Sequence, residues 1–293
     1  MITIIICSVN PDYLGAVKQN IDATIGVLYE LLAVDNRNSS KGICQVYNEA
    51  AAMAQYPYLC FVHEDVRFHT NGWGKVLVHN LSIPENVLLG VSGAVYKSDI
   101  PGSWVDCDKQ HYRSHTLQYF SEMGLTRQLH NPDKLQSSVV AVIDGVMMAT
   151  RKSTWEKQRF DADLLTGFHG YDLDYSLQAG MTGRVLVSHE ILLEHFSQGS
   201  FSGAWLHDTL LVHRKWKHIL PRHETEPGKR DPYSDYISCV AFLTRLLQVR
   251  SNRIKAIYYY LLLNVRYFRY NRFRFSKAVF RYLFLNKILR TST

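Results

Sequence analysis

Acidic and imidazole side chains follow several apolar runs of this sequence, at the point where each run ends. His63, Glu64 and Asp65 come directly after the run 59–62. Carboxylates at such a position can hold a hard divalent cation that bridges two phosphates, because Mg²⁺ and Mn²⁺ prefer oxygen ligands and keep positions open for substrate. A solvated acidic turn is the plainer alternative for this segment taken alone.

A second pair of carboxylates, Asp172 and Asp174, stands at the start of a predicted helix over 171–179. Carboxylates in a first helical turn are stabilised by the exposed backbone N–H groups and the helix dipole, which gives them a structural role. The functional alternative is a general base that faces a pocket. Because capping lowers a carboxylate pKa, such a base needs partial burial to restore its proton affinity.

Two more segments repeat this arrangement. Asp144 and Gly145 follow the apolar run 139–143, and His195 follows the run 191–193. A single histidine after a strand is more often a hydrogen-bonded structural residue than a metal ligand. Four such strand ends in one chain nevertheless favour a common site.

Motifs of several other enzyme classes are absent from the sequence. It has no GxGxxG at the first turn, no GxxxxGK[ST], no GxSxG and no HExxH. Dehydrogenases, P-loop kinases, serine hydrolases and zinc proteases of the HExxH type rely on these motifs, so none of those classes has local support.

The elements that must position these side chains alternate along the first third of the chain. Strands are predicted at 2–7, 29–34 and 58–62, with helices at about 11–26 and 44–54. This order, with nearly continuous apolar strands, predicts a parallel sheet covered by helices on both faces. Ligands of such sheets bind beyond the carboxyl ends of the strands, where Asp35 and Asp65 lie.

The middle of the chain is less regular. A further strand is predicted at 87–95, and short strands at 139–143, 184–187 and 191–193. Residues 97–137 lose periodicity and collect Trp104, several histidines and turn-forming residues. This stretch therefore predicts a long, partly ordered excursion, which is typical of functional or disordered loops.

The 293 residues, 46% of them hydrophobic, predict one large domain or a main domain with an appendage. Residues 236–293 carry 12 of the 33 Lys/Arg residues and none of the 26 Asp/Glu residues. We therefore expect a catalytic domain over 1–225 and a basic helical region over 226–293. Five scattered cysteines and the lack of an apolar run of about 20 residues predict a cytoplasmic protein.

Three interpretations compete for this basic tail, which continues to Lys287 and Arg290. Its amphipathic, aromatic-rich helices suit an anionic membrane surface on the cytoplasmic side. Nucleic acid would attract the same charge, although we expect no nucleic-acid partner. The third interpretation is a helical appendage that packs on the main domain.

The order of these motifs resembles that of the family-2-like glycosyltransferases with the GT-A fold, over about residues 3–221. The closer match is a bacterial subgroup whose metal motif reads Phe-Val-His-Glu-Asp-Val, as it does here. His63 replaces the first acid of the family's DxD motif, and Tyr171 replaces the Glu of its Glu-Asp motif. The resemblance implies an α/β fold with a Rossmann-like, mixed and mostly parallel sheet between helices, followed by the basic appendage.

The resemblance also implies which residues bind the donor, a nucleoside-diphosphate sugar of the UDP or GDP type. These lie in the first loops and the second helix: Ser8, Asn10, Asp35, Asn36, Asn48, Glu64 and Asp65. A divalent cation, Mn²⁺ or Mg²⁺, would be held by Asp65, His195 and His63.

The reaction implied is an inverting transfer of the sugar to an acceptor hydroxyl, on a surface polysaccharide or a lipid-linked glycan. Asp172 matches the family's catalytic base, with Asp174 as the open alternative, and Asp144 and Gly145 lie on the acceptor side. Two rivals remain: a non-catalytic binding protein that has kept the fold, and a nucleotidyltransferase. The Gly-rich, Arg-containing first loop of the latter is missing here.

Overall fold

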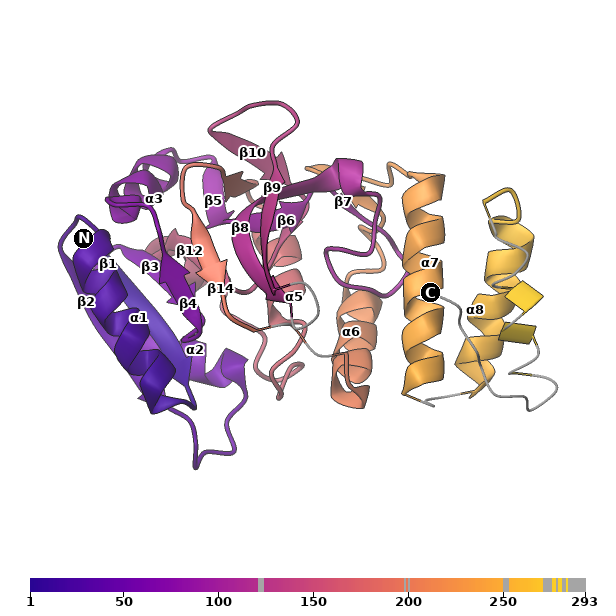
Figure 1. The fold of residues 1–293 in the computed structure, drawn as a ribbon, viewed down its shortest axis with the longest axis horizontal. Coiled ribbons are helices and arrows are strands. Elements are labelled where there is room, and N and C mark those ends of the chain that lie inside the picture. The colour runs from indigo at the N-terminus through magenta and orange to yellow at the C-terminus, as the bar shows by residue number, and fades with distance from the viewer. Residues whose placement is uncertain are drawn as a thin grey trace.

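The computed structural model describes residues 1–120, 124–197, 199, 201–249, 253–270, 276–277, 279–280 and 283. The elements follow one another along the long axis of the molecule (Figure 1). Strands β1 (Ile2–Ser8) and β2 (Tyr29–Asp35) lie at one end, and helices α7 (Pro232–Gln248) and α8 (Arg253–Arg266) lie at the other.

The main sheet has seven strands in the order β10-β13-β5-β12-β3-β1-β2. Its remaining members are β3 (Tyr58–Val62), β5 (Asn86–Gly90), β10 (Ser137–Val140), β12 (Met147–Arg151) and β13 (Arg184–Ser188). Five strands run in one direction, while β12 and β10 are antiparallel to their neighbours. The expected mixed, mostly parallel sheet is therefore confirmed, but the sequence did not predict β12, which lies between β3 and β5.

Helices cover both faces of this sheet. One apolar core joins it to α1 (Pro11–Thr24) and α3 (Trp73–Ser82). A second core joins the opposite face to α2 (Ile43–Met53), α4 (Lys152–Lys157) and α5 (Tyr171–Ala179). Because nearly every residue of the inner strands β1, β3, β5 and β12 is buried, these strands read as continuous apolar runs in the sequence.

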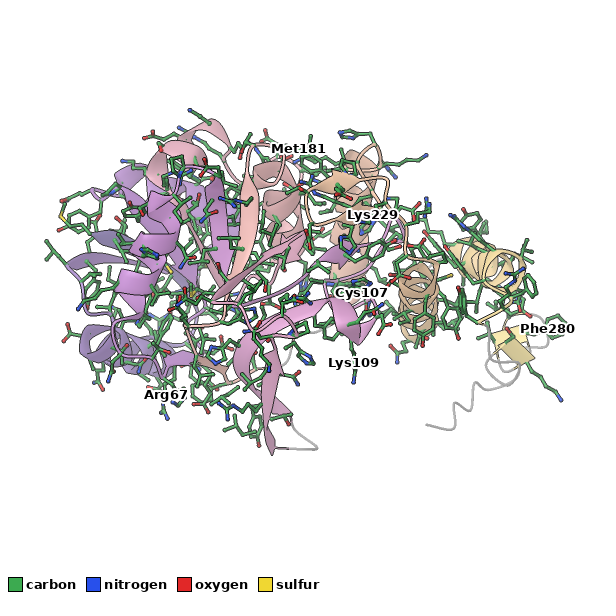
Figure 2. All side chains as sticks on the ribbon, turned by 90° about the horizontal axis from the view of Figure 1, so that it is seen from above. Arg67, Cys107, Lys109, Met181, Lys229 and Phe280 are labelled. Carbon is green, nitrogen blue, oxygen red and sulfur yellow. The ribbon has the colours of Figure 1, made fainter. Side chains whose placement is uncertain are left out.

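A second sheet corrects the expectation for residues 97–137. This stretch contains a hairpin of β8 (Tyr112–Phe120) and β9 (Gly124–His130), which extends away from the body of the molecule (Figure 2). Strand β8 pairs with β6 (Ser92–Ala94) and β14 (Leu193–His195). The hairpin was missed because buried positions of β8, such as Ser114 and Thr116, are polar, so the alternation of apolar and polar residues typical of a half-buried strand is weak.

The same sheet also contains β4 (Val66–Phe68) and β11 (Val142–Ile143). The single strand predicted at 87–95 is thus two strands, β5 and β6, in different sheets. The pair β10 and β11 divides the predicted strand 139–143 in the same way.

The C-terminal part is built on helices. Helix α6 (Gly203–Lys215) shares an apolar cluster with α7 and α8. A small sheet of β7 (Tyr96–Lys97), β15 (Arg222–His223) and β16 (Glu226–Pro227) lies beside them. None of the described helices combines the length and apolarity needed to cross a membrane. Lys287 and Arg290 lie outside the described residues.

The first cation of the tail is part of the packing. Arg245 on α7 forms a buried ion pair with Asp106, and its guanidinium lies over the rings of Phe201 and Trp205. In addition, Asp235 accepts hydrogen bonds from Tyr96 and from Arg230. Helix α7 is therefore held to the preceding chain by buried polar contacts as well as by its apolar face.

Candidate active site

The ends of β1 and β2 bring the first predicted site residues together. Ser8 and Asp35 are register partners, and the backbone N–H of Asn36 donates to the carbonyl of Ser8. Asp35 is exposed and accepts two hydrogen bonds from the side chain of Arg37, whose guanidinium lowers the pKa of Asp35 to about 2. An ionised, accessible acid thus lies at the carboxyl edge of the sheet.

Glu64 organises the loop that follows β1. Its carboxylate accepts from the hydroxyl of Ser8 at 2.6 Å and from the backbone N–H groups of Val9 and Asn10 at 3.0–3.2 Å. Asn10 in turn caps α1 with its side-chain oxygen. The structure therefore brings Ser8, Asn10 and Glu64 together, with the Glu64 oxygens already engaged by the protein.

Asn48 has a packing role on α2. Its amide donates to the carbonyl of Phe160 at 2.8 Å and accepts from Phe160 N–H and the indole of Trp155, both at 3.1 Å. These bonds tie α2 to the chain between α4 and α5. Its assignment to the donor nucleotide stays a prediction.

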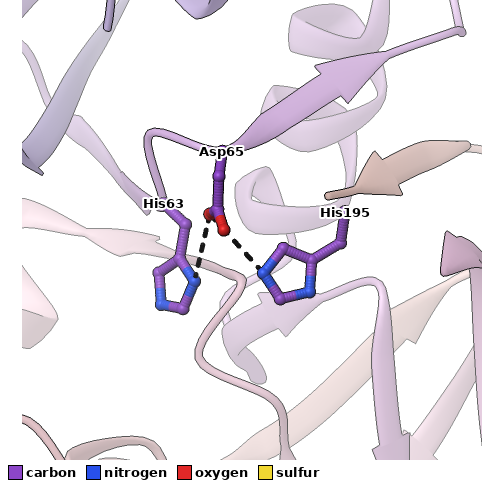
Figure 3. A group of neighbouring side chains, drawn as sticks. All are labelled: His63, Asp65 and His195. Carbon is purple, nitrogen blue, oxygen red and sulfur yellow. Dashed lines mark ion pairs between the residues drawn. The ribbon is translucent and has the colours of Figure 1, made fainter. Parts of the chain in front are cut away.

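His63, Asp65 and His195 converge, although His195 lies 130 residues further along the chain (Figure 3). One ligand atom from each lies within 4.8 Å of the others. Asp65 lies between the two imidazoles, with its Oδ1 3.8 Å from Nδ1 of His63 and 3.5 Å from Nε2 of His195. Antiparallel pairing of β4 with β14 causes this convergence, because it places Val66 opposite His195.

Hydrogen bonds set the tautomer of His195. Its Nδ1 lies 3.2 Å from Oε1 of Gln118, whose amide nitrogen donates to the carbonyl of Ser197 at 2.5 Å. The Gln118 oxygen is therefore the acceptor, and Nδ1 of His195 carries the proton. The lone pair of Nε2 is left facing Asp65, as in metal-binding histidines whose other nitrogen donates to the protein.

A comparable chain of hydrogen bonds reaches His63. The hydroxyl of Tyr171 lies 2.8 Å from Nε2 of His63 and 3.3 Å from the carbonyl of Gly145, to which it donates. Nε2 of His63 then supplies the proton of the shorter bond, so that Nδ1 offers its lone pair toward Asp65. A Cβ on Gly145 would lie 2.2 Å from this hydroxyl, so glycine is required here.

Protonation states at the three residues suit a cation. Burial and the neighbouring His195 lower the pKa of His63, which keeps that imidazole neutral. Burial opposes ionisation of Asp65, but the neighbouring His195 and Ser197 outweigh it and lower the pKa of Asp65. Two imidazoles and one carboxylate fit a divalent ion, and the nitrogen donors suit Mn²⁺ better than Mg²⁺.

The two carboxylates of α5 have different surroundings. Asp174 is buried and bonded to Lys215 at 2.8 Å and to the indole of Trp216 at 2.7 Å. Asp172 is only partly buried. Burial, together with the nearby Asp144 carboxylate, raises the pKa of Asp172 to about 7. A carboxyl with that pKa can exchange a proton near neutrality, as general bases do.

Asp144 links the surroundings of Asp172 with residues 97–137, which include Trp104. Its Oδ1 accepts from the backbone N–H of Val146, and its Oδ2 accepts from the indole of Trp104 at 2.5 Å. Its charge also acts on both His63 and Asp172. Asp144 is therefore close enough to a candidate ligand and to the candidate base to affect the ionisation of both, and its assignment to the acceptor side stays a prediction.

Sequence reasoning missed some of the residues that orient the site. Gln118 gave no signal, because no strand was predicted around it. Lys215, which neutralises Asp174, lies on a helix that the sequence analysis did not predict. Tyr171 was noted only as a departure from the family motif, whereas its hydroxyl bridges His63 and Gly145.

Solved structures with a similar fold include glycosyltransferases. GalNAc-T7, in a crystal structure with UDP, GalNAc and Mn²⁺, superposes with a TM-score of 0.51 and 12% identity, covering 91% of this chain and 56% of that longer chain. The mannosyltransferase PcManGT from Pyrobaculum calidifontis, with GDP-Man and Mn²⁺, gives 0.46 and 12%, covering 96% and 84%. The superposition on GalNAc-T7 shows a likeness of fold, and this fold is GT-A.

No curated protein matches this chain. A family model described as "Glycosyltransferase like family" matches residues 3–192, which include all the candidate site residues except His195. The chain therefore belongs to this glycosyltransferase-like family.

Proposed function

We propose that this protein is an inverting, metal-dependent glycosyltransferase that moves a sugar from a nucleoside-diphosphate sugar to an acceptor hydroxyl. The observation that carries the proposal is the convergence of His63, Asp65 and His195, together with a carboxyl, Asp172, whose pKa is raised to about 7 by burial and by Asp144, which also acts on His63. Tyr171 connects the two halves, because it contacts His63 and directly precedes Asp172.

In the proposed reaction Asp172 accepts the proton of the acceptor hydroxyl. The hydroxyl oxygen forms a bond to the anomeric carbon while the bond from that carbon to the diphosphate breaks, and the nucleoside diphosphate leaves with the electron pair. The sugar passes through an oxocarbenium-like state, as in glycoside hydrolysis. Asp174 takes no part, because Lys215 and Trp216 already hold it.

His63, Asp65 and His195 would hold the divalent cation. When bound, such an ion offsets the charge that develops on the departing diphosphate. Glu64 keeps the loop after β1 in place beside it through Ser8 and Asn10. Asp35 and Asn36, at the end of β2, would contact the nucleoside of a UDP or GDP donor.

The acceptor would lie on the side of Asp144 and Gly145, next to the segment 97–137 that contains Trp104. We propose a glycan or lipid-linked acceptor, and a cytoplasmic protein that can associate with the membrane through residues 226–293. In this organisation residues 1–225 form the catalytic domain.

Calorimetric titration of UDP and GDP, each with Mn²⁺, Mg²⁺ or no metal, tests the donor site. We expect one nucleotide to bind in a Mn²⁺-dependent manner, and Asp65→Ala to abolish this binding. Glu156→Ala, at an exposed acid on α4, is the matched control and should bind like the parent protein. Absence of metal-dependent binding would contradict the proposal and favour a non-catalytic protein with this fold.

Product analysis separates the enzyme classes. Transfer of sugar with release of a nucleoside diphosphate is expected when the correct donor and acceptor are supplied. Release of pyrophosphate from a nucleoside triphosphate and a sugar phosphate would instead identify a nucleotidyltransferase.

A further inference from the structure

Helix α8 has two apolar faces, of which only one is packed. Ala256 and Leu263, with Tyr267 just beyond the helix, are buried against the C-terminal helical cluster. The opposite face exposes large apolar side chains at successive spacings of four, three and four residues, namely Ile254, Tyr258, Leu261 and Val265, and Phe268 is exposed in the turn after the helix. Their exposed fractions lie between 53% and 79%. We refer to these five residues as the α8 stripe.

This pattern differs from scattered surface hydrophobicity. Residues at such spacings lie along one side of a helix, so the α8 stripe is continuous over about four turns. Contiguous exposed apolar surface of this kind marks a protein or membrane interaction site. Helix α8 also lies near the end of the long axis opposite β1 and β2, away from the main sheet (Figure 1).

The charge around the α8 stripe identifies its partner. Arg266 and Arg269 are exposed, Arg253 is exposed but donates to the carbonyl of Leu283, and residues 236–293 contain no acidic side chain. A coiled coil between two copies would have the same spacing, but it needs complementary charges beside the apolar seam. Here the flanking positions include Lys255 and Arg269 and no acid, so two copies would repel each other.

A nucleic-acid partner would explain the cations of this surface but not its apolar side chains. Phosphates would pair with the arginines, but aliphatic side chains such as Ile254, Leu261 and Val265 have no counterpart in a phosphate backbone. A bilayer with anionic lipids satisfies both halves, because acyl chains receive the apolar stripe and headgroups receive the cations. Tyr258 and Phe268 are aromatic residues, which suit the boundary between the lipid headgroups and the acyl chains.

We propose that the α8 stripe is a membrane-docking surface, with α8 lying in the plane of an anionic bilayer. Helix α7 then acts as the rigid connection, since Arg245 and Asp106 fix it to the preceding chain. Docking of α8 would place the acceptor of the proposed reaction at a lipid surface. This part of the inference rests on the proposed function. The docking itself requires neither the metal ligands nor Asp172.

Vesicle co-sedimentation of the full chain tests the proposal. The probes are phosphatidylcholine vesicles with and without phosphatidylglycerol, at low and high salt. The double variant Leu261→Asp/Val265→Asp should lower binding to anionic vesicles by about tenfold or more. Arg266→Gln and Arg269→Gln should each lower it by about fivefold and weaken its salt dependence.

The matched control is Leu28→Asp/Met53→Asp, which makes the same change at apolar residues that are 64% and 63% exposed elsewhere. It should bind vesicles like the parent protein. Equal vesicle binding by the stripe variant and the control, or no binding by the parent, would overturn the proposal. A parent dimer that the stripe variant converts to monomer, without vesicle binding, would assign the stripe to a second copy instead.

Nucleotide calorimetry on the stripe variant keeps the two proposals separate. Unchanged metal-dependent nucleotide binding shows that this variant is folded and that its defect lies in docking. Vesicle binding by a parent protein that binds no nucleotide would support the docking surface and contradict the glycosyltransferase proposal.

Discussion

Lys215 forms an ion pair of 2.8 Å with Asp174, so the second carboxylate of α5 is committed to its contact with α6. Among the described residues no cation is paired with the first carboxylate, Asp172, which lies near Asp144 instead. Of these two acids, which are separated by a single residue, Asp174 therefore has a structural role and Asp172 is available as a general base. The same isosteric substitution, Asp to Asn, tests each role.

Asp172→Asn should lower the rate of sugar transfer by about 10²- to 10⁴-fold, as expected for loss of a general base. Metal-dependent nucleotide binding should be unchanged, because Asp172 is not among the candidate ligands. Rates that stay within a factor of about two of the parent would exclude Asp172 as the base.

The pH dependence of the parent protein follows from the same carboxyl. A base must be ionised, so the rate should rise with pH through about 7, the pKa to which burial and Asp144 raise Asp172. Stability should change in the opposite direction. The unfolded carboxyl loses its proton near 3.8 and the folded one near 7, so ionisation costs stability as pH rises between these values. Thermal denaturation of Asp172→Asn should show a weaker fall over this range, and an unchanged fall would contradict the assignment.

Asp174→Asn should mainly reduce stability. The substitution keeps an acceptor for Trp216 but leaves Lys215 with Asp161 as its only carboxylate partner within the described part of the chain. We expect a loss of about 1–3 kcal/mol in the free energy of unfolding, measured by urea denaturation. Below the unfolding transition, the transfer rate should stay near that of the parent. A stable variant without activity would reverse the roles assigned to the two acids.

Gln118→Leu should weaken Mn²⁺ binding by about 10- to 100-fold, because His195 loses the acceptor that fixes its tautomer. Calorimetric titration of the metal measures this without any turnover. Gln118→Glu keeps an acceptor for Nδ1 and should restore much of the affinity, whereas a merely structural role would not distinguish the two variants. Gln110→Leu, at an exposed glutamine, should bind Mn²⁺ like the parent protein.

Arg245→Met should destabilise the protein by about 3–5 kcal/mol, because it leaves Asp106 buried without its cation. It also removes the contacts of the guanidinium with Phe201 and Trp205. Denaturant titration measures the loss. Arg214→Met, at an exposed arginine of α6, should change stability by no more than about 0.5 kcal/mol. Equal effects of the two substitutions would show that the pair does not anchor α7.

The sequence by itself determined the elements whose pattern is local. Apolar runs indicated β1, β2 and β3, and helical periodicity indicated α2 and α5 with ends within a residue or two of the observed ones. The acids and imidazoles at strand ends were visible for the same reason, because a polar residue after a buried run marks the edge of a sheet. The order of these motifs was also sufficient to indicate the family.

Only the tertiary structure decided which of these residues meet. Pairing of β4 with β14 brings His195 to Asp65, and packing of α6 on α5 neutralises Asp174 while leaving Asp172 available. The hairpin β8–β9 supplies Gln118 from a stretch with no apolar periodicity. Such choices depend on contacts between residues far apart in the chain, on burial and on a partner's charge. A linear pattern records none of these, so the sequence offered two candidate bases where the fold favours one.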